Sequence, residues 1–448
     1  MTLMEINAGD TAWVLVSAAL VMLMTPGLAF FYGGMVRVKS VLNMMMMSAI
    51  TIAVVTVLWV LVGYSLTFAG DTGHVIGNFS EVGLKGLMAP EAVSGTIPTL
   101  AFVAFQLMFA IITPALISGA IADRATFRGW IAFVVGWTTL VYFPVAHSVW
   151  FLDEGNGGWI GDKLGAIDFA GGTAVHVNAG AAALALAIVL GKRIGWRKDP
   201  MRPHSLPLVV LGAALLWFGW FGFNAGSALS AGTTAAITFV NTQVATAAAV
   251  IGWLIVERIR HGKATTLGMA SGAVAGLVAI TPACGALTPV GSLILGVIAG
   301  GICAFAVSLK YKLGFDDSLD VVGVHLVGGL VGSLAIGFLG TAAAPSAVDG
   351  LFYGGGVSQL GKQALANVVV ALYSFAVAFL LGKLIDKTIG FRLKEDDEVT
   401  GVDQVEHAET AYDFLGAAGL RGHTALARPQ AGTENESTEA SEKEGANA

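Results

Sequence analysis

The chain has 448 residues, of which 55% are hydrophobic and only 12% are charged, and its mean hydropathy is +0.76. Soluble domains carry about 25% charged residues, so this composition excludes a soluble globular protein and indicates a polytopic membrane protein. The 59 glycines fit a tightly packed helical bundle, because small residues let transmembrane helices approach closely.

A hydrocarbon core of about 30 Å needs roughly 20 apolar residues per helix, and on that measure the sequence predicts eleven membrane-spanning helices. The first ten residues contain no Lys or Arg, so the first apolar run is read as a span and not as a cleavable signal peptide. The eighth span is short, rich in glycine and the weakest of the set. In chain order, the spans are expected at residues 11–36, 43–69, 98–122, 128–152, 169–191, 205–228, 233–257, 266–282, 288–309, 321–341 and 364–391.

The basic residues indicate how these spans are oriented. Of the 24 Lys and Arg residues, only Lys85, Lys163 and Lys362 fall on the side of the membrane that also holds the N-terminus. Basic residues concentrate in cytoplasmic connections. We therefore expect the N-terminus outside, the C-terminus in the cytoplasm, and insertion in the cytoplasmic membrane.

Two histidines lie inside separate apolar stretches, each eight residues after an aspartate. Asp168 precedes His176 in DFAGGTAVHVNAG, and Asp317 precedes His325 in DSLDVVGVHLVGG. These units fall in spans five and ten, while FFYGG in span one corresponds to FGFNAG in span six. The pattern predicts an all-α fold with an inverted 5+5 repeat plus one extra helix, in which the functional site lies near the midplane of the membrane.

An ionisable residue inside a membrane span is a functional hypothesis by default. Eight helical residues rise about 12 Å, so His176 and His325 are expected at similar depths, where two neutral imidazoles can share one N–H···N bond. Two alternatives remain: an interhelical hydrogen bond without a transport role, and axial ligation of a haem by both histidines. Asp317 is expected to cap its helix, with Asp320 doing the same slightly deeper. Asp168 is expected to cap and also to stabilise an arriving cation.

The end of the chain differs from the rest in composition. Residues 1–391 are expected to form the transmembrane domain, and residues 392–448 a cytoplasmic tail. Within the tail, 416–448 is polar and short of large apolar residues, which is typical of disorder. The stretch 392–415 mixes aromatic residues, charges and a glycine, so we expect it to order against the cytoplasmic face.

Several sequence blocks together resemble one family. They are FYGG with Arg37 and Lys39, FQLMFAIITPALISGAIADR, PVAHSVW, DFAGGTAVHVNAG, GWFGFNAGSA and DDSLDVVGVHLVGG. In this order, across spans one to eleven, they resemble the ammonium transporter (Amt/MEP/Rh) family on its bacterial Amt side. The resemblance implies a homotrimer with one pore in each subunit.

The resemblance also implies roles for individual residues. It implies an outer ammonium-binding site at Trp150, Ser227 and Phe109, and a gate of stacked phenyl rings at Phe109 and Phe223. The pore and proton path would be lined by His176, His325, Asp168, Trp220 and Phe31. A regulatory stretch in the tail is implied at Glu398, Gly401, Asp403, His407, Glu409, Ala411 and Tyr412. One departure is Ala408, because the family usually has glycine after this histidine.

The expected activity is ammonium uptake, with no enzymatic reaction, cofactor, metal or nucleic-acid partner. Moving a bare cation into hydrocarbon costs tens of kcal/mol on Born estimates, whereas cation–π contact recovers about 2 kcal/mol. Because burial disfavours a charged amine, NH4+ is expected to lose its proton and pass as NH3. The resemblance also implies a trimeric PII-type regulatory protein as a partner on the cytoplasmic face, and the basic inner face and the tail agree with such binding. The alternatives are a passive NH3/CO2 gas channel of Rh type and an ammonium sensor that signals through its tail.

Overall fold

The computed structural model describes residues 5–199 and 201–412. In that part of the chain, ten helical stretches are long and apolar enough to cross a membrane, and α10 (Thr266–Ile280) is a shorter apolar helix. The protein is thus a multi-pass membrane protein, and the expected positions of its apolar helices are correct to within several residues. The ten long stretches are Ala8–Met35, Val38–Phe68, Thr99–Ile121, Phe127–Trp150, Gly172–Leu190, Leu206–Gly226, Thr233–His261, Pro289–Leu313, Val322–Leu339 and Ser358–Thr388.

Several of these stretches combine α-helix with π- or 3-10 segments. The other α-helices are α1 (Ala8–Met35), α2 (Val41–Leu58), α3 (Tyr64–Phe68), α4 (Thr99–Ser118), α5 (Phe127–Trp137), α6 (Phe143–Trp150), α7 (Asn178–Leu190), α8 (Leu206–Gly226), α9 (Thr233–His261), α11 (Pro289–Ala306), α12 (Leu309–Leu313), α13 (Val327–Leu339), α14 (Ser358–Thr388), α15 (Glu395–Thr400) and α16 (Val402–His407). The π-helical segments are η2 (Trp59–Gly63), η5 (Thr138–Tyr142), η6 (Trp159–Lys163), η7 (Gly172–Val177) and η8 (Val322–Leu326). The remaining elements are the 3-10 turns η1 (Val38–Ser40), η3 (Val82–Leu84), η4 (Gly119–Ile121) and η9 (Leu351–Tyr353), and the antiparallel pair β1 (Val93–Ser94) and β2 (Ile97–Pro98).

The helix starts follow from side-chain capping. Thr126, Ser205, Thr265 and Thr288 each accept a hydrogen bond from the backbone N–H three residues later, at the starts of α5, α8, α10 and α11. Such caps satisfy backbone donors that a helix leaves without partners at its N-terminus. In a membrane protein these bonds also help to fix where each span begins.

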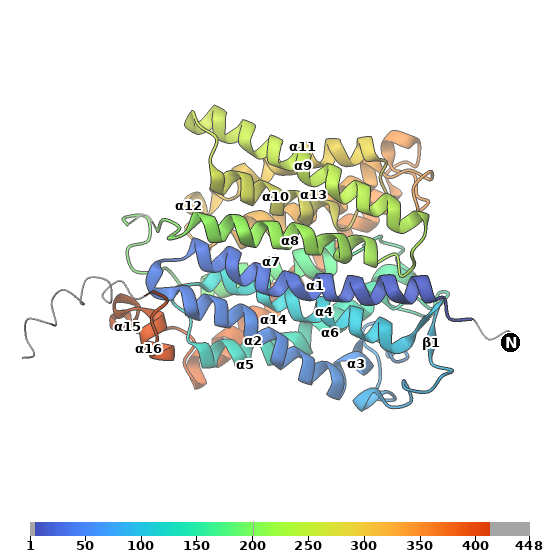
Figure 1. The fold of residues 1–448 in the computed structure, drawn as a ribbon, viewed down its shortest axis with the longest axis horizontal. Coiled ribbons are helices and arrows are strands. Elements are labelled where there is room, and N and C mark those ends of the chain that lie inside the picture. The colour runs from blue at the N-terminus through green and yellow to red at the C-terminus, as the bar shows by residue number, and fades with distance from the viewer. Residues whose placement is uncertain (1–4, 200, 413–448) are drawn as a thin grey trace, which may run out of the picture.

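Helices α1 and α8 pack closely along their length, and Figure 1 shows them side by side. Glycine permits this contact: a Cβ atom at Gly212 would lie 2.2 Å from the backbone nitrogen of Phe31, and one at Gly219 would lie 2.3 Å from Cγ of Met24. Close approach through small residues is the usual way that transmembrane helices associate. Helices α1 and α8 therefore form an extensive contact within the bundle.

The two histidine segments occupy π-helices that touch each other. His176 lies in η7 and His325 in η8, and η7 contacts η8. π-helical turns are rare and occur frequently at functional sites. The expectation of a regular α-helix from each aspartate to its histidine was therefore wrong, because both segments widen to π-helix before α7 and α13 begin.

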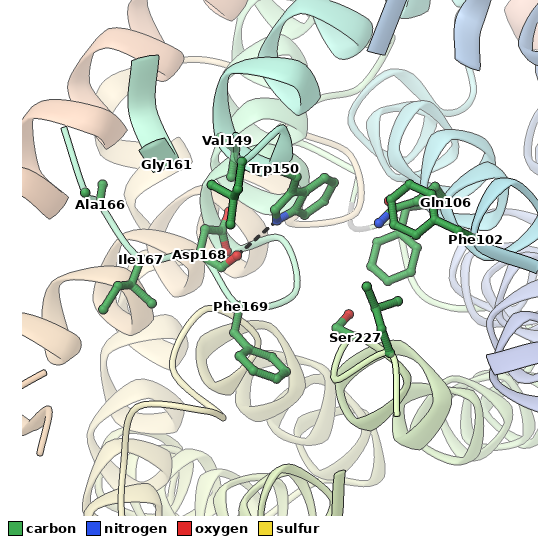
Figure 2. A pocket seen from close by; sticks show the side chains of 14 residues that line it. Phe102, Gln106, Val149, Trp150, Gly161, Ala166, Ile167, Asp168, Phe169 and Ser227 are labelled. Carbon is green, nitrogen blue, oxygen red and sulfur yellow. Dashed lines mark hydrogen bonds between the residues drawn. The ribbon is translucent and has the colours of Figure 1, made fainter. Parts of the chain in front are cut away.

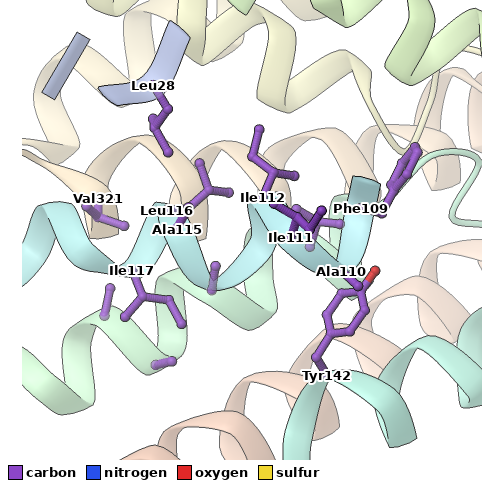
Figure 3. Packing of buried hydrophobic residues seen from close by; sticks show 14 of the residues in the cluster. Leu28, Phe109, Ala110, Ile111, Ile112, Ala115, Leu116, Ile117, Tyr142 and Val321 are labelled. Atoms are coloured by element: carbon purple, nitrogen blue, oxygen red, sulfur yellow. The ribbon is translucent and has the colours of Figure 1, made fainter. Parts of the chain in front are cut away.

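Between the helices, the core is built from tightly packed aliphatic and aromatic side chains. Figure 3 shows part of it along α4, where Phe109, Ile112 and Leu116 pack among neighbouring helices, with Tyr142 and Val321 nearby. All five side chains are buried. At the bundle ends, Figure 1 places α15 and α16 opposite the N-terminus, so we call these ends the tail face and the N-terminal face.

Candidate functional site

A cavity of about 380 Å³ opens at the N-terminal face of the bundle. Figure 2 shows Trp150 and Ser227 on its walls, from the ends of α6 and α8, with Phe102 and Gln106 of α4 nearby. The Ser227 hydroxyl donates to the Phe223 carbonyl at 2.8 Å, and its oxygen remains able to accept. The cavity therefore combines aromatic faces with a hydroxyl oxygen.

From this cavity, a row of aromatic and imidazole rings leads into the bundle. The Trp150 ring meets Phe109 edge-on at 5.8 Å between centroids, and Phe109 stacks on Phe223 at 4.2 Å. Phe223 stacks on His176 at 6.1 Å, and His176 on His325 at 5.3 Å. The five rings come from α6, α4, α8, η7 and η8. We call them the ring row.

The two imidazoles are in direct contact, as expected from their spacing. Nδ1 of His325 lies 3.3 Å from Nδ1 of His176, and both side chains are buried. One of these nitrogens must donate and the other accept, so the contact fixes complementary tautomers if both rings are neutral. Nε2 of His176 is buried without a hydrogen-bond partner among the described residues, which leaves a polar atom available inside an apolar path.

Trp220 lies beside this pair. Its ring stacks on His176 at 5.4 Å, and its indole N–H donates to the Thr281 hydroxyl at 2.8 Å. That hydroxyl in turn donates to the Leu277 carbonyl, so the orientation of the indole is fixed by α10. Phe31, expected toward the cytoplasmic side, is buried in α1 where α1 packs against α8.

Asp168 caps the start of η7 by accepting hydrogen bonds from four backbone N–H groups. Its carboxylate accepts backbone N–H bonds from Gly171, Gly172, Thr173 and Ala174 at 2.5 to 2.9 Å, two on each oxygen. Burial raises the pKa of this carboxyl above its ordinary value, while the four N–H bonds act in the opposite direction. The Asp168 carbonyl also accepts the indole N–H of Trp150 at 3.0 Å. Asp168 therefore connects the start of η7 to the cavity wall.

The two aspartates that precede η8, Asp317 and Asp320, make different contacts. Asp317 caps η8 as expected, accepting from the N–H groups of Val321 and Val322 at 3.1 and 2.8 Å. Burial raises the pKa of Asp317 to about 6. Asp320, expected to cap slightly deeper, instead has a φ of 64° and pairs with Lys310 at 2.6 Å. The expectation for Asp320 was wrong because its backbone turns out of the helix and the lysine lies within reach.

The tail residues dock against the tail face. The buried Glu398 carboxylate accepts from the Ile194 N–H at 2.7 Å and from Arg392 at 2.6 Å. Asp403 is also buried and accepts from the N–H groups of Leu42 and Asn43. Burial raises the pKa of Asp403, and the hydrogen bonds oppose that rise. Two buried carboxylates thus attach the tail to the start of α2 and to the segment that follows α7.

The rest of the expected tail stretch continues this contact. His407 Nε2 lies 3.0 Å from Asn43 Oδ1, and the Tyr412 hydroxyl lies 3.0 Å from His204 Nε2. Gly401 separates α15 from α16 with a φ of 123°, a backbone conformation that other residues rarely adopt. Glu409 and Ala411 line a cavity of about 190 Å³ between the tail and Lys39. Residues 413–448, which include the stretch expected to be disordered, lie outside the described residues.

Ala408 adopts a left-handed conformation at the end of α16, with a φ of 55°. Glycine takes this conformation without strain, whereas an L-residue with a side chain pays roughly 1–2 kcal/mol. The substitution therefore does not abolish the turn that ends the helix, and the alanine carries the strain of forming it.

Several residues of the site gave no signal in the sequence. Thr281 orients Trp220, and Phe102 and Gln106 line the cavity beside Phe109. Phe102 and Gln106 lie on an almost uniformly apolar helix, so their positions do not stand out in the sequence. Thr281 precedes a proline and belongs to no recognisable motif. The packing of α10 against α8 identifies Thr281, and the position of α4 in the cavity wall identifies Phe102 and Gln106.

Comparison with known proteins agrees with this architecture. A profile of the Ammonium Transporter Family matches residues 12–412. The ammonium transporter of Mycobacterium bovis is 60% identical over 438 residues, covering 92% of each chain. The crystal structure of Mep2 from Candida albicans superposes with a TM-score of 0.81 at 36% identity over 88% of each chain. The solved structure of a protein named Sensor Amt Protein has a TM-score of 0.82 at 29% identity, covering 90% of this chain and 98% of that one.

Proposed function

Because the chain belongs to the ammonium transporter family, we propose that it takes up ammonium along the ring row. The observation that carries this proposal is the unbroken sequence of ring contacts from the cavity to the histidine pair. Ammonium would bind outside, lose its proton near the phenyl rings and continue as NH3 toward the cytoplasm.

The first step would use the cavity wall. Trp150 and Phe109 offer aromatic faces, and Ser227 offers a hydroxyl oxygen that can accept from N–H. Cation–π contact contributes about 2 kcal/mol when the cation is desolvated, so these groups would replace part of the lost hydration. Potassium could bind to the same aromatic faces, but it has no proton to lose and so would stay charged at the next step.

The second step would occur where the rings close the path. Phe109 and Phe223 are both almost fully buried and stack at 4.2 Å, so they would act as the gate. Burial disfavours a charged amine, and deprotonation of ammonium at this point follows. Beyond the gate, His176, His325 and Trp220 would line the path, with imidazole nitrogens as hydrogen-bond partners for NH3. The same imidazoles would relay the proton separately, and this transfer would carry the current.

The arrangement in the membrane follows from three features. We infer eleven spans, counting α10 as the short eighth, with the N-terminus outside and the C-terminus in the cytoplasm. The opposition of the N-terminal and tail faces in Figure 1 and the basic residues of the tail-face connections support this orientation. The contacts α1 against α8 and η7 against η8 support an inverted 5+5 repeat with α14 as the extra helix.

Assembly and regulation belong to the same proposal. We infer a homotrimer, because the chain belongs to the ammonium transporter family and the resemblance to that family implies this assembly. Residues 1–391 would form the transporter and 392–448 a cytoplasmic tail, of which 392–415 would be the regulatory part. Basic connections on the tail face, at 192–202 and 258–263, would bind a trimeric PII-type protein, whose three linked contacts would gain affinity through avidity.

Currents recorded on a solid-supported membrane would test the proposal. Proteoliposomes of the full chain should give a transient current after an ammonium pulse and none after a potassium pulse. Trp150→Leu combined with Ser227→Ala should raise the half-saturation concentration more than it lowers maximal flux. His176→Ala or His325→Ala should abolish flux or selectivity, since the remaining imidazole loses its partner at a cost of about 1–3 kcal/mol. Wild-type flux and selectivity in both histidine variants would refute the ring row as the path.

Two other functions make different predictions in the same assay. A passive gas channel would move ammonia without current and would be insensitive to Trp150→Leu. The likeness to the solved structure named Sensor Amt Protein favours a sensor as the second alternative. A sensor would bind ammonium with little flux, and binding would change the contacts of the tail. Protease protection of residues 392–412 with and without ammonium would detect that change.

A further inference from the structure

A histidine outside the ring row is held in an unusual way near the outer cavity. His147 lies in α6, three residues before Trp150, and its side chain is completely buried. Its Nδ1 lies 2.8 Å from the carbonyl oxygen of Thr67, and its Nε2 lies 2.9 Å from a carboxylate oxygen of Asp71. Thr67 is in α3, and Asp71 follows in the next loop.

Both partners of this imidazole are hydrogen-bond acceptors. A neutral imidazole carries one N–H, so it can satisfy either the Thr67 carbonyl or the Asp71 carboxylate, but not both. An imidazolium carries two N–H groups and satisfies both contacts while pairing its charge with Asp71. The geometry is therefore complete only when His147 holds a second proton, and loss of that proton leaves one buried contact without a hydrogen.

Asp71 also faces a second imidazole. Nδ1 of His74 lies 3.2 Å from the other carboxylate oxygen and 2.9 Å from the Gly157 carbonyl. Burial by itself raises the pKa of Asp71, but hydrogen bonds from His147 and from the His74 N–H lower it below its ordinary value. This carboxylate is therefore ionised at neutral pH and available to hold a cation on His147.

Charged groups on the neighbouring elements are engaged elsewhere. On η6, Asp162 accepts from the Gly157 N–H at 2.6 Å, and Lys163 is exposed. Asp168, before η7, accepts four backbone N–H groups. On α14, Lys362 lies close to Gly165. The charged partner in contact with the His147 ring is Asp71.

The contacts of His147 fix the part of α6 that ends in Trp150. The His147 ring stacks on Phe151 at 4.8 Å with an angle of 15°. The His147 carbonyl accepts the Phe151 N–H at 3.0 Å. Trp150 lies between these two residues in the chain, and its indole is held by the Asp168 carbonyl. A change in the contacts of His147 would thus shift the backbone that carries the cavity wall.

We propose that His147 is a positioning residue for the outer site: as an imidazolium paired with Asp71, it holds Trp150 in the geometry that binds ammonium. This inference rests on the proposed function of Trp150 at the entrance. Removal of the second proton would leave one of the two acceptors without a donor and weaken this hold, so ammonium affinity falls as rising outer pH removes that proton.

The test measures the half-saturation concentration for ammonium in proteoliposomes over a range of rising outer pH values. Wild-type protein should show a rise of about tenfold across the range, the size that one charge-assisted hydrogen bond supports. His147→Gln keeps a donor for Asp71 but cannot titrate, and should give a flat profile. Asp71→Asn removes the charge and should flatten the profile as well. His261→Gln, an exposed histidine at the end of α9, should retain the wild-type profile.

Trp150→Leu separates this inference from the proposed function. If Trp150→Leu leaves half-saturation unchanged, the entrance itself has been misplaced and both ideas fail. If Trp150→Leu raises half-saturation while His147→Gln keeps the wild-type pH profile, the positioning role alone is overturned. Should His147→Gln fail to reach the membrane, Asp71→Asn decides: a flat profile supports the role, and a wild-type profile overturns it.

Discussion

Replacing Asp168 with asparagine should lower the stability of the folded protein and its ammonium uptake far more than an isosteric change usually does. The carboxylate receives two backbone N–H groups on each oxygen, from Gly171 and Gly172 on one and from Thr173 and Ala174 on the other. Asparagine has a single acceptor oxygen, and its amide group carries donors. In either orientation of the side chain, two buried N–H groups would face another donor.

The cost can be worked from these contacts. A buried donor without a partner costs about 1–3 kcal/mol, so two of them cost about 2–6 kcal/mol. The lost negative charge at the start of a helix adds up to about 2 kcal/mol in partly buried sites. Asp317 offers a comparison, because each of its oxygens accepts a single N–H. Asp317→Asn should therefore lose only one contact and cost about half as much.

The measurement is thermal unfolding of the purified full chain in detergent, followed by uptake in proteoliposomes. Asp168→Asn should lower the melting temperature about twice as much as Asp317→Asn and should reduce ammonium uptake, because η7 carries His176. Asp162→Asn is a matched control in a neighbouring segment, where the carboxylate accepts from the N–H of Gly157 alone among the described residues. If Asp168→Asn unfolds at the wild-type temperature with full uptake, the cap is not needed and this reasoning is refuted.

Three further outcomes follow from single contacts. Ala408→Gly relieves a left-handed φ of 55° and should stabilise the docked tail by roughly 1–2 kcal/mol, seen as slower proteolysis there; unchanged proteolysis would contradict it. Thr281→Val removes the acceptor of the Trp220 indole and should lower maximal uptake with little effect on half-saturation; a changed half-saturation alone would argue against a role inside the pore. Gly212→Ala places a Cβ 2.2 Å from a backbone nitrogen of α1 and should lower the melting temperature, whereas Gly361→Ala, where the space is open, should not.

Much of the fold could be predicted from the sequence. A backbone crossing hydrocarbon must satisfy its hydrogen bonds internally, so long apolar runs identify the spans without knowledge of their neighbours. Among the described apolar stretches that correspond to expected spans, α10 is the short one, with 15 residues, and the sequence indicated that span as the weakest. The repeated spacing of Asp168 to His176 and Asp317 to His325 similarly indicated that two distant segments would meet.

What the tertiary structure decided is how those segments meet. The ring row depends on contacts between residues far apart in the chain. The sequence also did not indicate the π-helical form of η7 and η8 or the ion pair between Asp320 and Lys310. His147 is the clearest case, since in the sequence it is one polar residue in PVAHSVW, and only folding brings two acceptors to its ring. Apolar periodicity and span length are local properties that a sequence carries by itself. The protonation and orientation of a buried group are set by its neighbours, and these are determined only when the helices pack.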